Sequence, residues 1–299
     1  MDFPLTMLGA QALRAVPYFP GRDWAISKVL DRRCADRTVT GNFGRGLKFC
    51  GNPAHERYIR QLALMRWARP ALAPVLEAFL RPGSNFVDAG AMFGLYTLWA
   101  ARIVGPEGRV HSFEPNPYSA DHLERHVEIN HFSDRVEISR VALGETAEEI
   151  ELLRLSDAPG LTSRYLTDQK TAETVRVPQE RLDVLLEDRP VDLIKIDVEG
   201  MEYEVLQGAA GLLQRTPGPA LVFESEPNSL GAADRKWSDV VGWLRERDYS
   251  VWSMSGRGVT LENGEGPPGS LNVVAARADE YESALELLSR SRFEAGQSI

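Results

Sequence analysis

Acidic side chains follow two predicted strands at the point where each strand ends. Asp197 and Glu199 come directly after the apolar segment 191–196, while Glu224 closes the segment ALVFE and Glu226 follows it. The carboxyl ends of neighbouring parallel strands meet at one edge of a sheet, so we expect these four carboxylates to converge. A carboxylate at such an edge can act as a general base toward a hydroxyl group, and oxygen ligands can hold Mg²⁺ or Ca²⁺.

Three interpretations of these carboxylates stay open. Asp197, Glu199 and Glu224 are candidates for catalysis, and we expect Asp197 nearest the reacting atoms because it directly follows its strand. All four carboxylates are also candidate ligands of a divalent cation. The third interpretation is structural: Asp197 or Glu199 caps the helix predicted over 201–213, and Glu202 lies on the solvated face of that helix.

Two groups of basic side chains have structural interpretations. Lys195 lies inside the apolar strand, where a lysine needs a partner, so we expect a buried ion pair with one of the neighbouring acids. His122 and His126 have a metal-like spacing on a predicted helix. That helix lies away from the expected strand ends, so we interpret the histidine pair as surface residues.

A glycine turn follows the first regular strand, NFVDA, in the sequence Gly90-Ala91-Met92-Phe93-Gly94. Such a turn between the first strand and its helix is where an open α/β sheet binds a nucleotide-like ligand. The dinucleotide fingerprint needs a second glycine for close approach of a pyrophosphate, and Met92 occupies that position here. An adenosine ligand without phosphate, such as S-adenosylmethionine, therefore fits the turn better.

The next strand ends in Glu114-Pro115-Asn116-Pro117. A carboxylate at this place can accept hydrogen bonds from both hydroxyls of a ribose. The two prolines hold the following loop extended. With the glycine turn, Glu114 predicts a nucleoside site.

Four blocks of the chain, VDAGAMFGLYT, SFEPNP, VALG and LIKIDVEGMEYEVLQGA, appear in this order within residues 84–226. Together they resemble the FkbM family of class I S-adenosylmethionine-dependent methyltransferases. The resemblance implies a Rossmann-like sheet of seven strands and transfer of a methyl group, usually to a hydroxyl oxygen of a sugar or secondary metabolite. It places Asp88, Gly90 and Gly94 in the methionine-binding loop and Glu114 at the ribose.

The chain departs from the general class I pattern after the third strand. Many class I enzymes carry an acid there that contacts the adenine amine, whereas this segment reads Arg140-Val141-Ala142-Leu143. We therefore expect backbone groups near Val141 and Ala142 to bind adenine. The expected cofactor-binding set is Asp88, Gly90, Ala91, Gly94, Glu114, Pro115, Asn116, Val141, Ala142 and Asp197.

The elements that position these residues alternate between strand and helix from residue 85 onward. This pattern predicts an α/β fold with a mostly parallel sheet, and two final strands without a helix between them predict an antiparallel edge hairpin. Segments 148–155 and 173–178 are further candidate strands. We expect an N-terminal helical cap over 1–80, a methyltransferase domain over 81–280 and a C-terminal helix or tail over 281–299.

Composition narrows the function classes. The net charge of −9 opposes a nucleic-acid partner. The sequence contains no run of about 18 apolar residues, so we expect no membrane span. The first residues do not resemble a signal peptide, and two cysteines need not pair, so we expect a cytoplasmic protein.

Together these observations predict an S-adenosylmethionine-dependent O-methyltransferase of secondary metabolism. Its acceptor is expected to be a small molecule with a hydroxyl group, of sugar, glycoside or polyketide-like type, bound by residues 1–80 and 156–171. A divalent cation is an optional second cofactor. The alternatives are a nicotinamide-dependent oxidoreductase and a member that binds the cofactor without catalysis.

Overall fold

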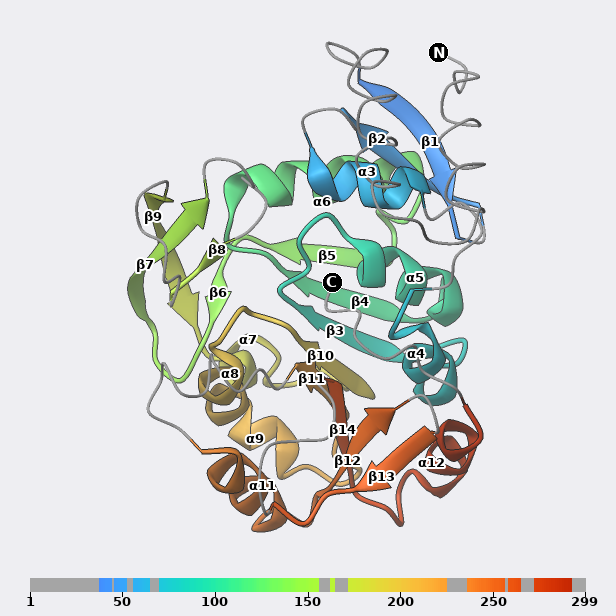
Figure 1. Cartoon of the computed structure of the whole chain (residues 1–299), viewed down its shortest axis with the longest axis vertical. Coiled ribbons are helices and arrows are strands. Elements are labelled where there is room, and N and C mark those ends of the chain that lie inside the picture. The colour runs from blue at the N-terminus through green and yellow to red at the C-terminus, as the bar shows by residue number, and fades with distance from the viewer. Residues whose placement is uncertain are drawn as a thin grey trace, which may run out of the picture.

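The computed structural model describes residues 38–44, 46–52, 56–64, 70–155, 162–164, 172–224, 236–255, 258–264 and 272–291. Its centre is an eight-stranded sheet of order β13-β12-β14-β11-β10-β3-β4-β5 (Figure 1). The five strands from β11 to β5 are parallel, and β14 and β13 run antiparallel to their neighbours. The bounds are β3 Asn85–Ala89, β4 Arg109–Phe113, β5 Val136–Ser139, β10 Leu193–Ile196, β11 Ala220–Glu224, β12 Ser250–Ser255, β13 Gly258–Leu261 and β14 Asn272–Ala276.

Helices cover both faces of this sheet because side chains alternate between the faces along each strand. Phe86 of β3 packs into one hydrophobic cluster, and the next residue, Val87, packs into the other. The first cluster includes residues of α3 Arg57–Leu64, α4 Ala73–Phe79, α5 Leu95–Val104, α6 Pro117–Ile129 and α12 Glu282–Ser289. The second includes residues of α7 Leu182–Leu185, α8 Glu202–Gly208, α9 Ala210–Leu213 and α11 Trp237–Arg245.

The predicted alternation of strand and helix is confirmed, as is the antiparallel pairing of β12 with β14. Two details differ from the prediction. The helix expected over 201–213 is interrupted at Ala209, which separates α8 from α9. The connector before β14 contains β13, which adds an eighth strand at the sheet edge.

The region before residue 80 includes a hairpin as well as helices. Strands β1 Val39–Phe43 and β2 Leu47–Gly51 pair antiparallel beside α3 and α6 (Figure 1). Phe43 and Ile59 are fully buried in the same cluster as Leu98 and Leu123 of the helices on the sheet. The hairpin β1–β2 and helix α3 therefore complete the main core.

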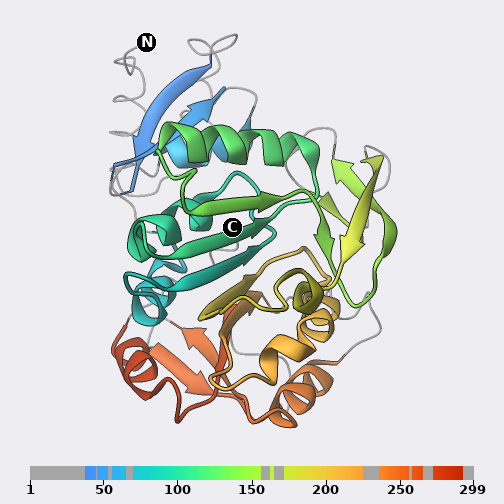
Figure 2. The same ribbon diagram turned by 180° about the vertical axis from the view of Figure 1, so that it is seen from behind.

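A second, four-stranded sheet projects from the end of the main sheet (Figure 2). Its strands are β6 Ala142–Leu143, β7 Glu148–Leu155, β8 Thr162–Ser163 and β9 Ala172–Glu180. The strands predicted at 148–155 and 173–178 are thus confirmed. None of the helices in the described part of the chain is long and apolar enough to span a membrane.

Candidate functional site

The carboxyl ends of β3 and β10 bring the glycine turn against Asp197. Ala89 pairs with Ile196, and the Asp197 amide donates to the Ala89 carbonyl at 3.1 Å. Gly90 has φ +75°, and a Cβ there would lie 1.9 Å from the Asp197 carbonyl oxygen. The close approach of the two chains therefore requires glycine at position 90.

Lys195 connects this turn to two carboxylates. Its Nζ lies 3.1 Å from Asp88 Oδ1 and 3.5 Å from Asp197 Oδ2, and it donates to the Gly90 carbonyl at 2.7 Å. Burial alone would lower the pKa of Lys195, but the two carboxylates raise it above its ordinary value. The expected buried ion pair is confirmed, with two acids in place of one.

Glu114 is held at the end of β4 by backbone amides. Oε2 accepts from the Met92 amide at 2.7 Å, and Oε1 accepts from the Asn116 amide at 2.8 Å. Burial raises the pKa of Glu114 to about 7, although both hydrogen bonds oppose that rise. Each carboxylate oxygen keeps a further lone pair, so the pair can accept from two adjacent hydroxyl groups.

The turn after β10 is supported by Glu202, which the sequence placed on a solvated face. That prediction is wrong: Glu202 is buried, and its Oε1 accepts from the amides of Val198 and Gly200 at 3.1 Å each. The helix N-cap, Met201, makes no side-chain cap hydrogen bond. The turn folds back over the start of α8, so Glu202 accepts hydrogen bonds from the amides of the turn. Capping of this helix by Asp197 or Glu199, the structural role considered for them, is not observed within the described ranges.

The predicted acids reach the site unequally. Asp197 follows β10 and Glu224 ends the neighbouring β11; burial is the main cause of the raised pKa of the Tyr96 phenol, and both carboxylates add to it. Glu199 is exposed on the turn, with φ +55°, and its carbonyl accepts from Ser163 Oγ at 2.7 Å. Glu226 lies outside the described residues. Among the residues described, no three His, Cys, Asp or Glu side chains are grouped to hold a metal ion.

Two tyrosines near the acids escaped the sequence analysis. Burial raises the pKa of Tyr96 and of Tyr58, with Asp88 and Asp197 adding to the rise in both. The Tyr96 hydroxyl is buried, and a backbone hydrogen bond at Leu72 opposes the rise of its pKa. Only packing of α3 and α5 on the sheet brings these phenols to the acids, so no local sequence signal identifies them.

The remaining predicted cofactor residues surround Glu114 and the end of β5. Asn116 caps α6 by accepting from the Tyr118 amide at 3.1 Å, and Pro115 precedes it. The Ala91 amide donates to the Phe113 carbonyl at 3.0 Å, which anchors the glycine turn to β4. Of the two residues expected near adenine, Val141 is half-buried and Ala142 is buried. Ala142 pairs with Gln179 in the second sheet.

The surface interpretation of the histidine pair is wrong. His126 is fully buried, and its ring nitrogens contact the Phe93 carbonyl and the backbone of Cys50. His122 stacks on the Phe93 ring at 4.4 Å between centroids. The hairpin β1–β2 covers the face of α6 that the sequence analysis expected to be exposed to solvent.

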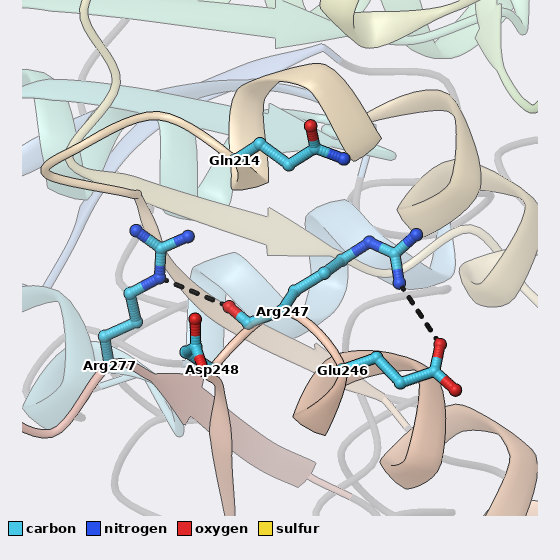
Figure 3. A pocket seen from close by; sticks show the side chains of 5 residues that line it. All are labelled: Gln214, Glu246, Arg247, Asp248 and Arg277. Atoms are coloured by element: carbon cyan, nitrogen blue, oxygen red, sulfur yellow. Dashed lines mark hydrogen bonds and ion pairs between the residues drawn. The ribbon is translucent and has the colours of Figure 1, made fainter.

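A pocket of about 470 Å³ lies at the opposite end of the sheet (Figure 3). Its lining residues are Gln214, Glu246, Arg247, Asp248 and Arg277. Arg277 donates to the carbonyls of Arg215 and Leu213 at 2.7 Å each, so its charge already serves to join chain segments. The predicted site residues do not line this pocket.

Comparison with known proteins gives a family match. A model of the methyltransferase FkbM domain matches residues 88–251, which include the glycine turn, Glu114 and Asp197. Methyltransferase sdnD of Sordaria araneosa is 31% identical over 204 residues, covering 58% of this chain and 78% of that protein. Methyltransferase 1 of Beauveria bassiana (strain ARSEF 2860) is 31% identical over 150 residues, covering 42% of this chain and 59% of that protein.

Solved structures of methyltransferases are also similar. An O-methyltransferase from Bacillus cereus in complex with SAH is 18% identical, with a TM-score of 0.40, covering 70% of this chain and 81% of that chain. A SAM-dependent O-methyltransferase from Thermotoga maritima is 13% identical, with a TM-score of 0.40, covering 79% of this chain and 76% of that chain.

Proposed function

Because the chain belongs to the FkbM methyltransferase family, we propose that it transfers the methyl group of S-adenosylmethionine to a hydroxyl oxygen of a small molecule. The acceptor classes are sugars, glycosides and polyketide-like secondary metabolites. The family decides against the nicotinamide-dependent oxidoreductase. The observation that carries the proposal is the Asp197 carboxylate beside the Gly90 turn, ion-paired and partly exposed.

The residues present fit S-adenosylmethionine. Glu114 offers a carboxylate to ribose hydroxyls, and its contact with the Met92 amide ties that carboxylate to the glycine turn. Asp88 and Asp197 outnumber Lys195, so acidic side chains are in excess in this cluster. An excess of acidic side chains favours a cationic ligand. When bound, S-adenosylmethionine supplies an electrophilic methyl group on a positively charged sulfur.

Asp197 is the proposed general base. An alcohol becomes a good nucleophile as its proton leaves, and a positioned base contributes roughly 10²–10⁴ in rate. Asp197 lies on the same face of the sheet as Lys195, because alternate residues along a strand share a face. Glu224 ends the neighbouring strand and is the proposed second contact to the acceptor. Glu199 is exposed on the turn, and we propose no catalytic role for it.

A divalent cation is not part of this proposal. The described residues hold no group of three suitable side chains, and Glu226 lies outside them. Chelation is expected to leave turnover unchanged.

The acceptor is proposed to enter from the side of the N-terminal region and the second sheet. Tyr58 of α3 lies close enough to Asp197 for that carboxylate to raise its pKa. Ser163 of β8 holds the Glu199 carbonyl. These contacts support the assignment of 1–80 and 156–171 to acceptor binding; most of 156–171 falls outside the described residues.

The test is turnover of S-adenosylmethionine with a panel of sugars, glycosides and phenolic polyketides, measured as S-adenosylhomocysteine release. Asp197→Asn keeps the shape and removes the charge, and is expected to lower kcat by roughly 10²–10⁴. Asp192→Asn is the matched control at the other end of β10, where the Asp192 side chain accepts from the Asn85 amide at 2.7 Å. Equal rates for the two variants would refute the role of Asp197.

A further inference from the structure

His126 of α6 contacts the glycine turn and the N-terminal hairpin at once. Its Nδ1 lies 2.7 Å from the Phe93 carbonyl, and its Nε2 lies 3.0 Å from the Cys50 nitrogen and 2.9 Å from the Cys50 oxygen. The ring is fully buried, and burial lowers the pKa of His126, which favours the neutral form. In that form Nδ1–H donates to Phe93 and Nε2 accepts from the Cys50 amide.

Asn130, the C-cap residue one turn further along α6, makes a comparable clamp on the hairpin, and its side-chain amide also donates to the His126 carbonyl at 2.7 Å. Its side chain accepts from the Lys48 amide and donates to the Lys48 carbonyl, each at 2.8 Å. Lys48 and Cys50 are alternate residues of β2, so both present their backbone groups to the same side. His126 and Asn130 thus bind the same strand, but only His126 also binds the glycine turn.

The turn needs such an anchor because its backbone is strained. Met92 has φ +49°, a conformation that a residue other than glycine rarely adopts. The Met92 amide donates to Glu114 on one side of this residue. On the other side, the carbonyl of the following residue, Phe93, accepts from His126. The two hydrogen bonds hold both ends of the strained unit, and the first of them involves the proposed ribose carboxylate.

We propose that His126 is a positioning residue for the S-adenosylmethionine site: its Nδ1–H fixes the Phe93 carbonyl and thereby the Met92 amide that orients Glu114. Because a carbonyl oxygen can only accept, the Phe93 oxygen itself requires the proton on Nδ1. The inference rests on the proposed function, since it assigns the turn to the cofactor.

Two substitutions separate the contact made by Nδ1 of His126 from the contact made by Nε2. His126→Asn places an amide donor near the position of Nδ1 and loses the contact with Cys50. His126→Gln places its amide near the position of Nε2, so it can accept from Cys50 but loses the donor to Phe93. Asn130→Ala is the matched control: it removes both hydrogen bonds to Lys48 and the one to the His126 backbone carbonyl, but leaves the His126 ring and its contact with the turn in place.

Calorimetric titration with S-adenosylhomocysteine is the readout, with the melting temperature measured in parallel. We expect His126→Gln to weaken binding about tenfold or more, the effect of one lost hydrogen bond at the turn. His126→Asn and Asn130→Ala are expected to lower the melting temperature and to change the affinity less than about threefold. Affinity that follows the melting temperature across the three variants would overturn the inference.

Amide hydrogen exchange of Asn130→Ala gives a test that does not need the Gln variant to fold. We expect faster exchange in 47–51 and unchanged exchange in 90–94. Equal acceleration in both segments would show that the hairpin as a whole, and not His126, holds the turn. Parent protein that fails to bind S-adenosylhomocysteine would instead refute the proposed cofactor.

Discussion

Protonation of Glu114 should control cofactor affinity in the neutral pH range. Burial raises the pKa of this carboxyl to about 7 in the ligand-free protein, from an ordinary value of 4.5. Only the ionised form offers acceptor lone pairs to both ribose hydroxyls while it also accepts from Met92 and Asn116. Binding therefore requires loss of the proton, and affinity should fall as pH falls below 7.

The expected size follows from proton linkage. With a pKa of about 7, the dissociation constant for S-adenosylhomocysteine should rise about tenfold from pH 8 to pH 6, and about tenfold again to pH 5. Loss of folding does not explain such a change. Between about 4.5 and 7 the folded protein binds more protons at Glu114 than the unfolded chain does, so the contribution of this group to stability falls as pH rises.

Calorimetry from pH 5 to pH 8 on two variants isolates the group. Glu114→Gln should bind at least about tenfold more weakly at pH 8 and lose the pH dependence, because its amide cannot match all four donors. Glu202→Gln is the matched control: burial also raises the pKa of Glu202 to about 7, but its Oε1 binds only turn amides. A flat affinity profile of the parent, or one abolished by Glu202→Gln, would refute the reasoning.

Three further perturbations have defined outcomes. Asp197→Asn should reduce kcat by roughly 10²–10⁴ with little change in calorimetric affinity for the donor, and a near-parental kcat would exclude the proposed base. Gly90→Ala should abolish donor binding in calorimetry, because the added Cβ would lie 1.9 Å from the Asp197 carbonyl oxygen; retained binding would contradict the close packing of the turn. Tyr249→Phe loses a 2.8 Å hydrogen bond to the Pro219 carbonyl and should lower the melting temperature, and an unchanged melting temperature would show that this buried hydrogen bond adds nothing to stability.

The strands and helices that carry the glycine turn could be predicted closely. Segments 85–89, 95–104 and 109–113 each lie between nearby glycines or prolines, and the structure begins and ends them at the same residues. Their boundaries depend on local chemistry. The register of β3 with β10 follows from the parallel topology, so Asp197 beside Gly90 was also predictable.

The supporting contacts could not be predicted because they depend on distant parts of the chain. His126 looks like a solvated residue of α6 until β2 covers it, and Glu202 looks like a solvated residue of α8 until the turn 197–200 folds back on it. Tyr58 reaches the acids only because α3 packs against Phe93, with ring centroids 5.2 Å apart. In each case a polar side chain is satisfied by backbone groups or rings far away in sequence.

The position of the transferred methyl group tests the central claim most directly. The protein is incubated with S-adenosylmethionine carrying an isotope-labelled methyl group and the hydroxyl-bearing panel, and the product is examined by NMR. We predict a labelled methoxy carbon on an acceptor oxygen, absent with Asp197→Asn. Label on a nitrogen or carbon atom, or no transfer to any hydroxyl of the panel by the parent protein, would contradict the account.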